Sequence, residues 1–245
     1  MPNIVDERGY NQIFKPTSAT AIRRRRRASA IVQAMGQVDH STGAEAPHIL
    51  ELGCGMGDLA HELALLTDAK VTGVDLSTKF IEQAKAKFQH PKLEYLVTDL
   101  TQSTPANDQA RYDFIVGNGI LHHLYYHLDT FLPVLGRWLK PGGRLIFWEP
   151  NLWNPYVFLI FKVPFLRRAA NLEPDEMAFT PNDIRQKLAA AGFDDTRATT
   201  RDFLLPNTPK SLIKPVIGIG NLLDQIPVIN RLAQSVFFVS GRSSD

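Results

Sequence analysis

Three glycines at alternate positions, Gly53, Gly55 and Gly57, follow a short apolar segment and precede Asp58, which opens an amphipathic run. Without Cβ atoms, such a turn lets the backbone bend sharply and approach a ligand closely. The start of the following helix adds free N–H groups. The dinucleotide-binding turn has the spacing G-x-G-x-x-G, whereas the third glycine here comes one residue early. The turn therefore indicates a nucleotide-type cofactor, but not its identity.

Acidic and amide side chains sharpen this interpretation. Glu51 stands at the end of an apolar strand, where it would attract a cationic ligand and repel a pyrophosphate. Asp75 ends a second apolar segment 18 residues after Gly57, which is about the spacing at which an acid meets ribose hydroxyls. Asp99 and Asn118 follow two further apolar segments in the same way.

The positions of these residues imply one kind of sheet. Apolar segments alternate with amphipathic ones, which predicts a parallel sheet with right-handed crossovers. The expected strands are 48–52, 70–75, 93–97, 111–118, 144–149, one within 193–204, and 236–241, and the expected helices include 18–35, 78–88, 129–140 and 180–191. Ligands bind beyond the carboxyl ends of such strands, which is where every residue named above falls.

Four segments together resemble a known family. E-L-G-C-G-M-G, V-T-G-V-D-L-S, Y-D-F-I-V-G-N-G-I-L-H-H-L and L-K-P-G-G-R-L-I-F occur in the order typical of class I S-adenosylmethionine-dependent methyltransferases. The resemblance covers roughly residues 31–150. It implies an α/β fold: a doubly wound, mostly parallel, seven-stranded Rossmann-like sheet with helices on both faces, here with two apolar helical insertions.

The resemblance also implies S-adenosyl-L-methionine as the cofactor and an enzyme that methylates a small molecule. The residues expected to bind the cofactor are Glu51, Gly53, Cys54, Gly55, Gly57, Asp75, Leu76, Asp99, Leu100, Asn118 and Gly119. In this interpretation Glu51 lies near the ammonium group and Asp75 holds the ribose. Asp99 with Leu100 reads the adenine, and Asn118 with Gly119 faces the methyl group.

His123 and His122 are the candidate catalytic bases, because they come directly after the fourth strand. The alternative is that one of them only packs or bonds a backbone carbonyl. The Asn-Pro-Pro-Tyr signature of enzymes that methylate amides and adenine amines is absent, so O- or C-methylation is favoured. No metal is predicted, since only Asp129 adds a carboxylate near the pair at helical spacing.

Composition limits the partners. The 245 residues carry a formal net charge of +2, so nucleic acid is not the expected partner. Cys54 is the only cysteine, which excludes an intramolecular disulfide. The basic residues gather in Arg23–Arg27, which we interpret either as a solvated helix face or as an anion-attracting patch for a phosphorylated substrate or an acidic membrane.

The chain is expected to have an N-terminal arm and basic helix over 1–43 and a methyltransferase domain over 44–245. Two apolar insertions are expected at about 150–179 and 205–234. Both would leave the carboxyl edge of the sheet and fold together as a lid over a hydrophobic or amphipathic, lipid-like acceptor. Alternatively, they pack only on each other or form a dimer interface. The sequence does not define the oligomeric state.

No signal peptide or membrane span is recognised, so we expect a cytoplasmic protein and leave peripheral membrane contact open. Two other functions remain to be separated. A non-catalytic cofactor-binding or membrane-docking protein would share these motifs. A nicotinamide-dependent oxidoreductase is disfavoured by the early third glycine, by Glu51 and by the absence of a Tyr-x-x-x-Lys pair.

Overall fold

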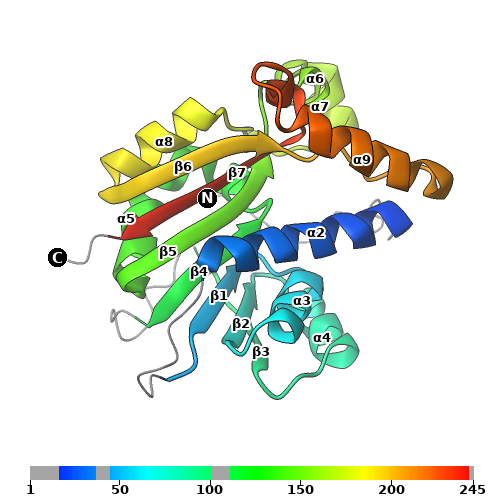
Figure 1. The fold of residues 1–245 in the computed structure, drawn as a ribbon. Coiled ribbons are helices and arrows are strands. Elements are labelled where there is room, and N and C mark those ends of the chain that lie inside the picture. The colour runs from blue at the N-terminus through cyan, green and yellow to red at the C-terminus, as the bar shows by residue number, and fades with distance from the viewer. Residues whose placement is uncertain (1–16, 37–44, 101–110, 243–245) are drawn as a thin grey trace.

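The computed structural model describes residues 17–36, 45–100 and 111–242. Within these ranges one seven-stranded sheet has the order β3-β2-β1-β4-β5-β7-β6 (Figure 1). The strands are β1 (His48–Leu52), β2 (Lys70–Asp75), β3 (Leu93–Val97), β4 (Tyr112–Asn118), β5 (Leu139–Pro150), β6 (Phe193–Arg201) and β7 (Ser235–Arg242). The first five run parallel to one another, and β7 pairs antiparallel with both β5 and β6. The predicted doubly wound, mostly parallel sheet is confirmed.

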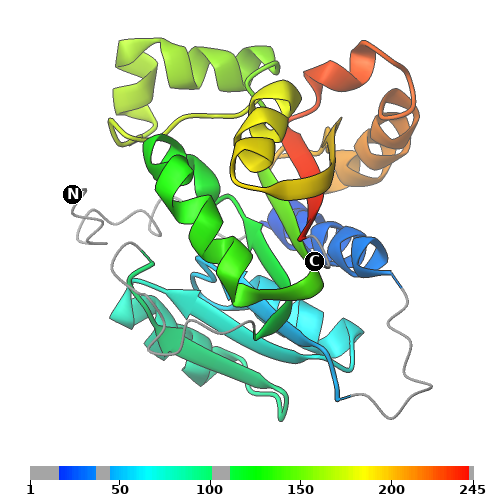
Figure 2. The ribbon, with the colours of Figure 1, turned by 90° about the vertical axis from the view of Figure 1, so that its left-hand side faces the viewer.

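Helices cover both faces of this sheet (Figures 1 and 2). The helices α2 (Ser18–Met35), α3 (Asp58–Leu66) and α4 (Thr78–Lys87) pack on one face, and α5 (Leu128–Trp138) and α8 (Pro181–Ala190) on the other. Each face has its own apolar core, in which buried strand residues alternate between the two sides. This arrangement fixes the carboxyl ends of β1 to β5 as one edge.

The largest difference from the predicted elements is β5. It begins at Leu139 rather than Arg144, because the segment L-K-P-G-G is itself extended and Leu139 pairs with Tyr112 before the register shifts. Other strand and helix bounds agree with the predictions to within about two residues. The predicted arm before Thr17 and the predicted loop 103–109 lie outside the described residues.

The five consecutive arginines are each bonded within the protein. Arg23 and Arg27 contact the buried Asp202, while Arg24 contacts Asp58, Arg25 contacts Glu62 and Arg26 contacts Asn221. The arginines of α2 can reach these partners because the helix lies between α3 on one side and the segment after β6 on the other. Neither a purely solvated face nor a free anion-attracting patch describes this arrangement. The opposite side of α2 places Ala28 and Ile31 in the core of the domain that we predicted to begin at residue 44.

The two insertions are helical but pack on different partners. The first contains α6 (Pro155–Lys162) and α7 (Pro164–Ala169), which pack with Ala178 and Met177. The second contains η3 (Lys210–Leu212), α9 (Ile213–Leu223) and η4 (Ile229–Leu232), and its α9 packs on the first turns of α2. Helix α9 therefore packs on α2, whereas η4 contacts the first insertion, since the Asn151 and Asn154 side chains donate to the carbonyls of Arg231 and Leu232. The expected single lid stays a prediction. No helix in the described ranges combines the length and the hydropathy that a bilayer span requires.

The ion pair of Asp202 with Arg23 and Arg27 should dominate the stability of this region. Burial alone would raise the pKa of Asp202, but Arg27 and Arg23 hold it below its ordinary value. Asp202→Asn should lower the free energy of unfolding by ~3–5 kcal/mol, since it leaves buried guanidinium groups uncompensated. Denaturant unfolding measures this loss. Asp195→Asn is the matched control: it also replaces an aspartate at positive φ, but its pair with Arg197 is exposed, so a loss above ~1 kcal/mol there would contradict the argument.

Candidate cofactor site and histidine pair

The glycine turn between β1 and α3 is shaped from both sides. A Cβ on Gly57 would lie 2.4 Å from the hydroxyl oxygen of Tyr95, and one on Gly53 would lie 2.6 Å from Ile120. A Cβ on Gly55 would meet nothing within 4 Å, although its φ of +51° disfavours other residues. Two of the glycines are therefore required by packing, and the third leaves an open face beside the turn.

Glu51 lies at the carboxyl end of β1 and is only 2% exposed. Its Oε2 atom has no hydrogen-bond partner among the described residues. Burial raises the pKa of its carboxyl group to about 8, and the nearby Asp75 acts in the same direction, whereas a hydrogen bond from the Ala60 backbone opposes the shift. A cationic group that reaches Oε2 would therefore lower this pKa again and favour the ionised carboxylate.

Asp75 at the end of β2 joins its strand to the glycine turn. Its Oδ2 accepts a hydrogen bond from the Gly55 N–H at 2.8 Å, and its Oδ1 accepts one from the Ser77 N–H at 2.9 Å. Each carboxylate oxygen can accept further hydrogen bonds. Asp75 thus holds the turn in place, and its carboxylate retains the chemistry that diol hydroxyls require, while its ribose-binding role stays a prediction.

The remaining predicted cofactor residues follow the same edge. Asp99 and Leu100 come directly after β3, where both are partly exposed. Leu76 is 37% exposed at the turn into α4, whereas Cys54 is buried beside Gly73. Burial raises the pKa of the Cys54 thiol far above its ordinary value, so this cysteine is a small packing residue rather than a nucleophile.

Asn118 ends β4 and is held by the basic helix. Its Oδ1 accepts a hydrogen bond from Arg27 Nη1 at 2.5 Å, and the Arg27 guanidinium lies 5.0 Å from the centre of the Trp148 ring. Arg27 also contacts Asp202 and Ser235. Burial lowers its pKa to about 10, which leaves it charged at neutral pH. One arginine of the predicted basic run therefore positions a residue at the cofactor edge.

Glu149, at the end of β5, organises the loop that carries the two histidines. Its carboxylate accepts hydrogen bonds from the backbone N–H groups of Ile120, Leu121 and His122 at 2.8–3.3 Å. It also lies 2.9 Å from Nδ1 of His122. His122 is buried, and burial lowers its pKa, so its imidazole is neutral at pH 7. These contacts give His122 a positioning role, while its predicted catalytic role stays a prediction.

His123 has a different environment. Its side chain is 21% exposed, and its Nδ1 lies 2.9 Å from Oε1 of Glu176, a residue 53 positions later that is buried. The first insertion brings Glu176 here, because the Met177 N–H donates to the His122 carbonyl. An ionised Glu176 requires a proton on Nδ1 of His123, which leaves the lone pair on Nε2. No local signal in the sequence marked Glu176, and Glu149 was expected only as the last residue of the strand 144–149.

Three potential metal-ligand groups meet at this point. One atom each from His122, His123 and Glu176 lies within 4.8 Å of the others. Sequence spacing could not show this cluster, because Glu176 comes from the insertion. Both histidine Nδ1 atoms already face carboxylates, so paired hydrogen bonds account for the geometry without an ion.

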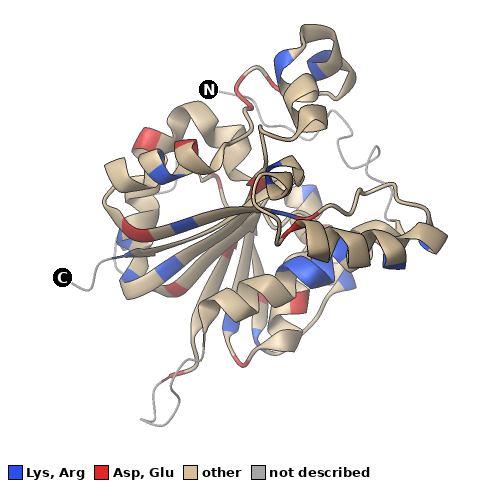
Figure 3. Cartoon of the chain, turned by 45° about the horizontal axis from the view of Figure 1, so that its top comes forward, with Lys and Arg blue, Asp and Glu red and all other residues tan. Residues whose placement is uncertain are grey.

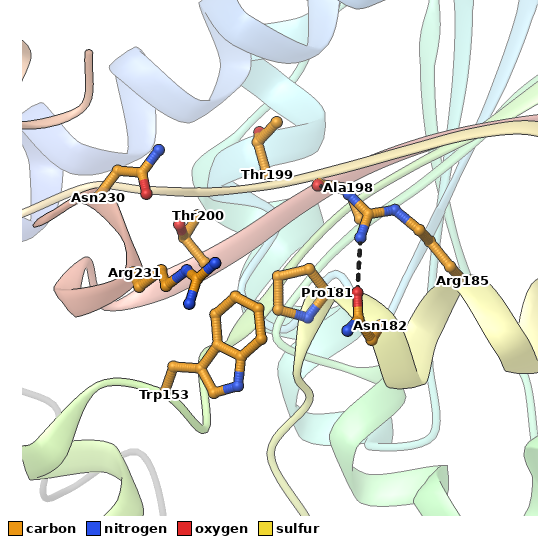
Figure 4. Close-up of a pocket in the computed structure, with 9 residues that line it drawn as sticks. All are labelled: Trp153, Pro181, Asn182, Arg185, Ala198, Thr199, Thr200, Asn230 and Arg231. Atoms are coloured by element: carbon orange, nitrogen blue, oxygen red, sulfur yellow. Dashed lines mark hydrogen bonds between the residues drawn. The ribbon is translucent and has the colours of Figure 1, made fainter. Parts of the chain in front are cut away.

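A separate pocket of about 290 Å³ lies beside β6, between α8 and the two insertions (Figure 4). It is lined by Trp153, Pro181, Asn182, Arg185, Ala198, Thr199, Thr200, Asn230 and Arg231. Both insertions contribute to it, but none of the predicted site residues lines it. It is not the apolar cavity that we expected between the insertions and His123.

The described residues fit S-adenosylmethionine. An open glycine face, a buried carboxylate with an unpartnered oxygen, and an acid at the end of the second strand lie along one sheet edge. The open glycine face can receive the amino-acid part of the cofactor, the buried carboxylate its ammonium group, and the strand-end acid its ribose hydroxyls. Fold and site together define a cofactor-binding α/β domain whose ligand carries a positive charge.

Comparisons with known proteins identify the family. Residues 49–143 match the family described as "Methyltransferase domain". The chain is 31% identical over 174 residues to demethylmenaquinone methyltransferase of Chlorobaculum parvum, covering 68% of this chain and 69% of that protein. It is 34% identical over 116 residues to fatty-acid O-methyltransferase of Mycolicibacterium smegmatis, covering 45% and 41%. A methyltransferase structure from Archaeoglobus fulgidus aligns with a TM-score of 0.64 at 15% identity, over 95% of this chain and 97% of that one.

The chain belongs to the class I S-adenosylmethionine-dependent methyltransferases. The predictions of this family, of a methyltransferase domain and of S-adenosylmethionine as its cofactor are confirmed. The chain spans 40–63% of the length of several other curated relatives that it matches.

Proposed function

We propose that this protein transfers a methyl group from S-adenosylmethionine to a small-molecule acceptor, by O- or C-methylation. The observation that carries the proposal is the position of the Glu176–His123 pair. It follows β4, and the cofactor residues Glu51 and Asp75 end β1 and β2, so all of them lie at one edge of the parallel sheet. A proton acceptor and the cofactor cradle thus share the edge at which such folds bind their ligands.

Bound S-adenosylmethionine supplies a methyl group that is already activated on a sulfonium centre. The protein therefore has mainly to position the methyl donor and the acceptor and to remove water from between them. Glu51 binds the ammonium group, Gly55 admits the amino-acid part, and Asp75 accepts from the ribose hydroxyls. Asp99 and Leu100 contact the adenine. Asn118, fixed by Arg27, faces the methyl group together with Gly119.

His123 acts as the base where the acceptor atom loses a proton. Glu176 keeps the Nδ1 proton in place, so that Nε2 is the nitrogen that takes the proton from an acceptor hydroxyl or acidic carbon. His122 is tied to Glu149 and holds the loop. This division of roles is supported by exposure, since only His123 of the two is substantially accessible.

The acceptor is proposed to be hydrophobic or amphipathic. Large apolar side chains of both insertions, such as Phe158, Phe165 and Leu222, are exposed at the end of the molecule that carries the site. Among the relatives, one is named for a fatty acid and another for malonyl-acyl-carrier protein. We keep the predictions of a cytoplasmic protein without a nucleic-acid partner.

The cofactor site can be tested on Asp75. Asp75→Ala should weaken binding of S-adenosylmethionine by ~1–3 kcal/mol, because the ribose and the Gly55 N–H both lose their acceptor. Calorimetric titration measures this, and Asp75→Asn, which keeps one carbonyl oxygen, should lose less. Unchanged affinity in Asp75→Ala, or tight binding of a nicotinamide dinucleotide, would contradict the assignment.

Turnover requires a second experiment. The purified protein is incubated with methyl-labelled S-adenosylmethionine and a panel of fatty acids, hydroxylated isoprenoids and quinols. Label transfer to an apolar acceptor supports the proposal. Cofactor binding without transfer to any of these, or to polar counterparts of similar size, would instead indicate a non-catalytic binding protein.

A further inference from the structure

The first insertion exposes apolar side chains that its own packing does not use. Tyr156, Phe158, Leu159 and Phe165 are 47–63% exposed, whereas Val157 and Phe161 on the opposite side of α6 are buried. The short helix α7 buries none of its side chains. An isolated exposed apolar residue is ordinary, but four large ones on two consecutive short helices form an apolar surface that none of the other described residues buries.

The second insertion has the same character. Leu212, Ile219 and Leu222 are 51–64% exposed on η3 and α9, while Ile213 and Gly220 face inward. The following turn adds Ile226 and Val228 at 43% and 67%. Because α9 buries its inner side against α2 and Leu204, its outer side is left as a second apolar face.

The exposed charged residues of both insertions are all basic. Residues 151–172 and 203–223 contain no aspartate or glutamate, and the acids that follow these ranges, Glu173, Asp175, Glu176 and Asp224, are buried or partly buried. Lys162 and Arg168 on the first insertion, and Lys210 and Lys214 on the second, are exposed and form no ion pair with another described residue. Figure 3 shows Lys and Arg on both helix groups. Apolar residues flanked by cations without acids are typical of helices that lie in a lipid interface.

Both faces lie at the same end of the molecule. In Figures 1 and 2, α6–α7 and α9 stand at the top, beyond the carboxyl ends of the strands, and they flank the edge at which the cofactor residues lie. A flat surface laid across both insertions would therefore cover this end of the sheet. A planar partner suits two faces that are separated from each other better than one groove-binding chain does.

We propose that α6–α7 and the segment from η3 to η4 together form a docking surface for an anionic lipid membrane. The aromatic and aliphatic side chains enter the headgroup boundary, and Lys162, Arg168, Lys210 and Lys214 contact acidic headgroups. Docking is peripheral, since no described helix can span the bilayer. It would present the acceptor edge of the proposed methyltransferase to molecules dissolved in the membrane. The docking itself does not require that the methyl transfer proposal is correct.

Vesicle flotation tests the proposal without any turnover. The full chain should float with vesicles of phosphatidylcholine and phosphatidylglycerol, and binding should fall with added salt and on vesicles of phosphatidylcholine alone. Leu222→Asp and Phe165→Asp should each reduce the bound fraction at least tenfold. Reversing Lys162 and Arg168 to Glu should reduce it by about fivefold or more for each charge.

Controls come from the same molecule. Leu65→Asp replaces a leucine of comparable exposure on α3, away from the insertions, and Lys85→Glu reverses an exposed lysine on α4. Both should bind vesicles like the unchanged protein. Failure to float, equal loss in the controls, or binding that ignores phosphatidylglycerol would overturn the proposal. So would light scattering that shows a dimer of the unchanged protein converted to monomer by Leu222→Asp, since the face would then be an interface between two copies.

Discussion

Replacing His123 with alanine should lower kcat for methyl transfer by about 10²–10⁴-fold while the affinity for S-adenosylmethionine changes little. The effect is confined to turnover because His123 lies after β4, next to Glu176, and not among the residues that cradle the cofactor. Steady-state kinetics with labelled methyl donor and calorimetric titration of the cofactor together measure it. His127→Ala is the matched control, since His127 is exposed at the end of the same 3-10 helix, η2 (Leu121–His127).

Glu176 provides the test that distinguishes a base from a packing residue. Glu176→Gln keeps the size of the side chain but removes the charge that stabilises a protonated His123. It should lower kcat by roughly tenfold while the affinity for S-adenosylmethionine stays the same. If His123 only packs, kcat of this variant should stay at that of the unchanged protein. Chelators should not affect the rate; a rate lost with chelator and restored by a divalent metal would instead assign the His122–His123–Glu176 cluster to an ion.

Binding of the cofactor should depend on pH through Glu51. Burial raises the pKa of this carboxyl to about 8 in the free protein, and a neighbouring ammonium group favours its ionised form. Affinity should therefore rise by up to about tenfold per pH unit between pH 6 and 8 and level off above it. S-adenosylhomocysteine, which has the same amino-acid part, is a suitable probe. Calorimetry in buffers of different ionisation enthalpy should show close to one proton released at pH 7.

Glu51→Gln separates this linkage from other titrations. The variant should bind the cofactor more weakly at pH 8 and lose most of the pH dependence. The stability of the free protein depends on pH in the opposite direction to cofactor affinity. Because folding raises the pKa of Glu51, the contribution of this residue to the free energy of unfolding is complete below the ordinary pKa of glutamate and is lost as pH rises through about 8. Without cofactor, Glu51→Gln should thus be relatively more stable than the unchanged protein above pH 8. Parallel pH profiles for the two proteins would refute the assignment.

The cofactor edge follows from the sequence because its signals are local. A strand of apolar residues, a turn that only glycine fits, and an acid at the next strand end are all set within about 25 residues of Glu51. In a parallel sheet, right-handed crossovers then bring consecutive strand ends to one edge. The ends of β1, β2 and β4 accordingly lie next to one another, and the Gly55 N–H reaches Asp75 across two of them, while the binding roles of these residues stay predictions.

The partners of charged and exposed residues depended on packing between distant segments. Arg27 meets Asp202 at a separation of 175 residues, and His123 meets Glu176 at 53. Residue type and spacing do not distinguish these acids from the other acids of the chain. Which acid pairs with which base depends on the surfaces that the folded core brings together. The faces of the insertions are similar: composition marked both segments as apolar, but only the fold showed that α2 buries one side of α9 and that the other side remains exposed. Local spacing therefore determined the sheet and the cofactor cradle. The fold alone decided that Glu176 is the partner of His123 and that the outer sides of the insertions are exposed, because these contacts exist only after the core has formed.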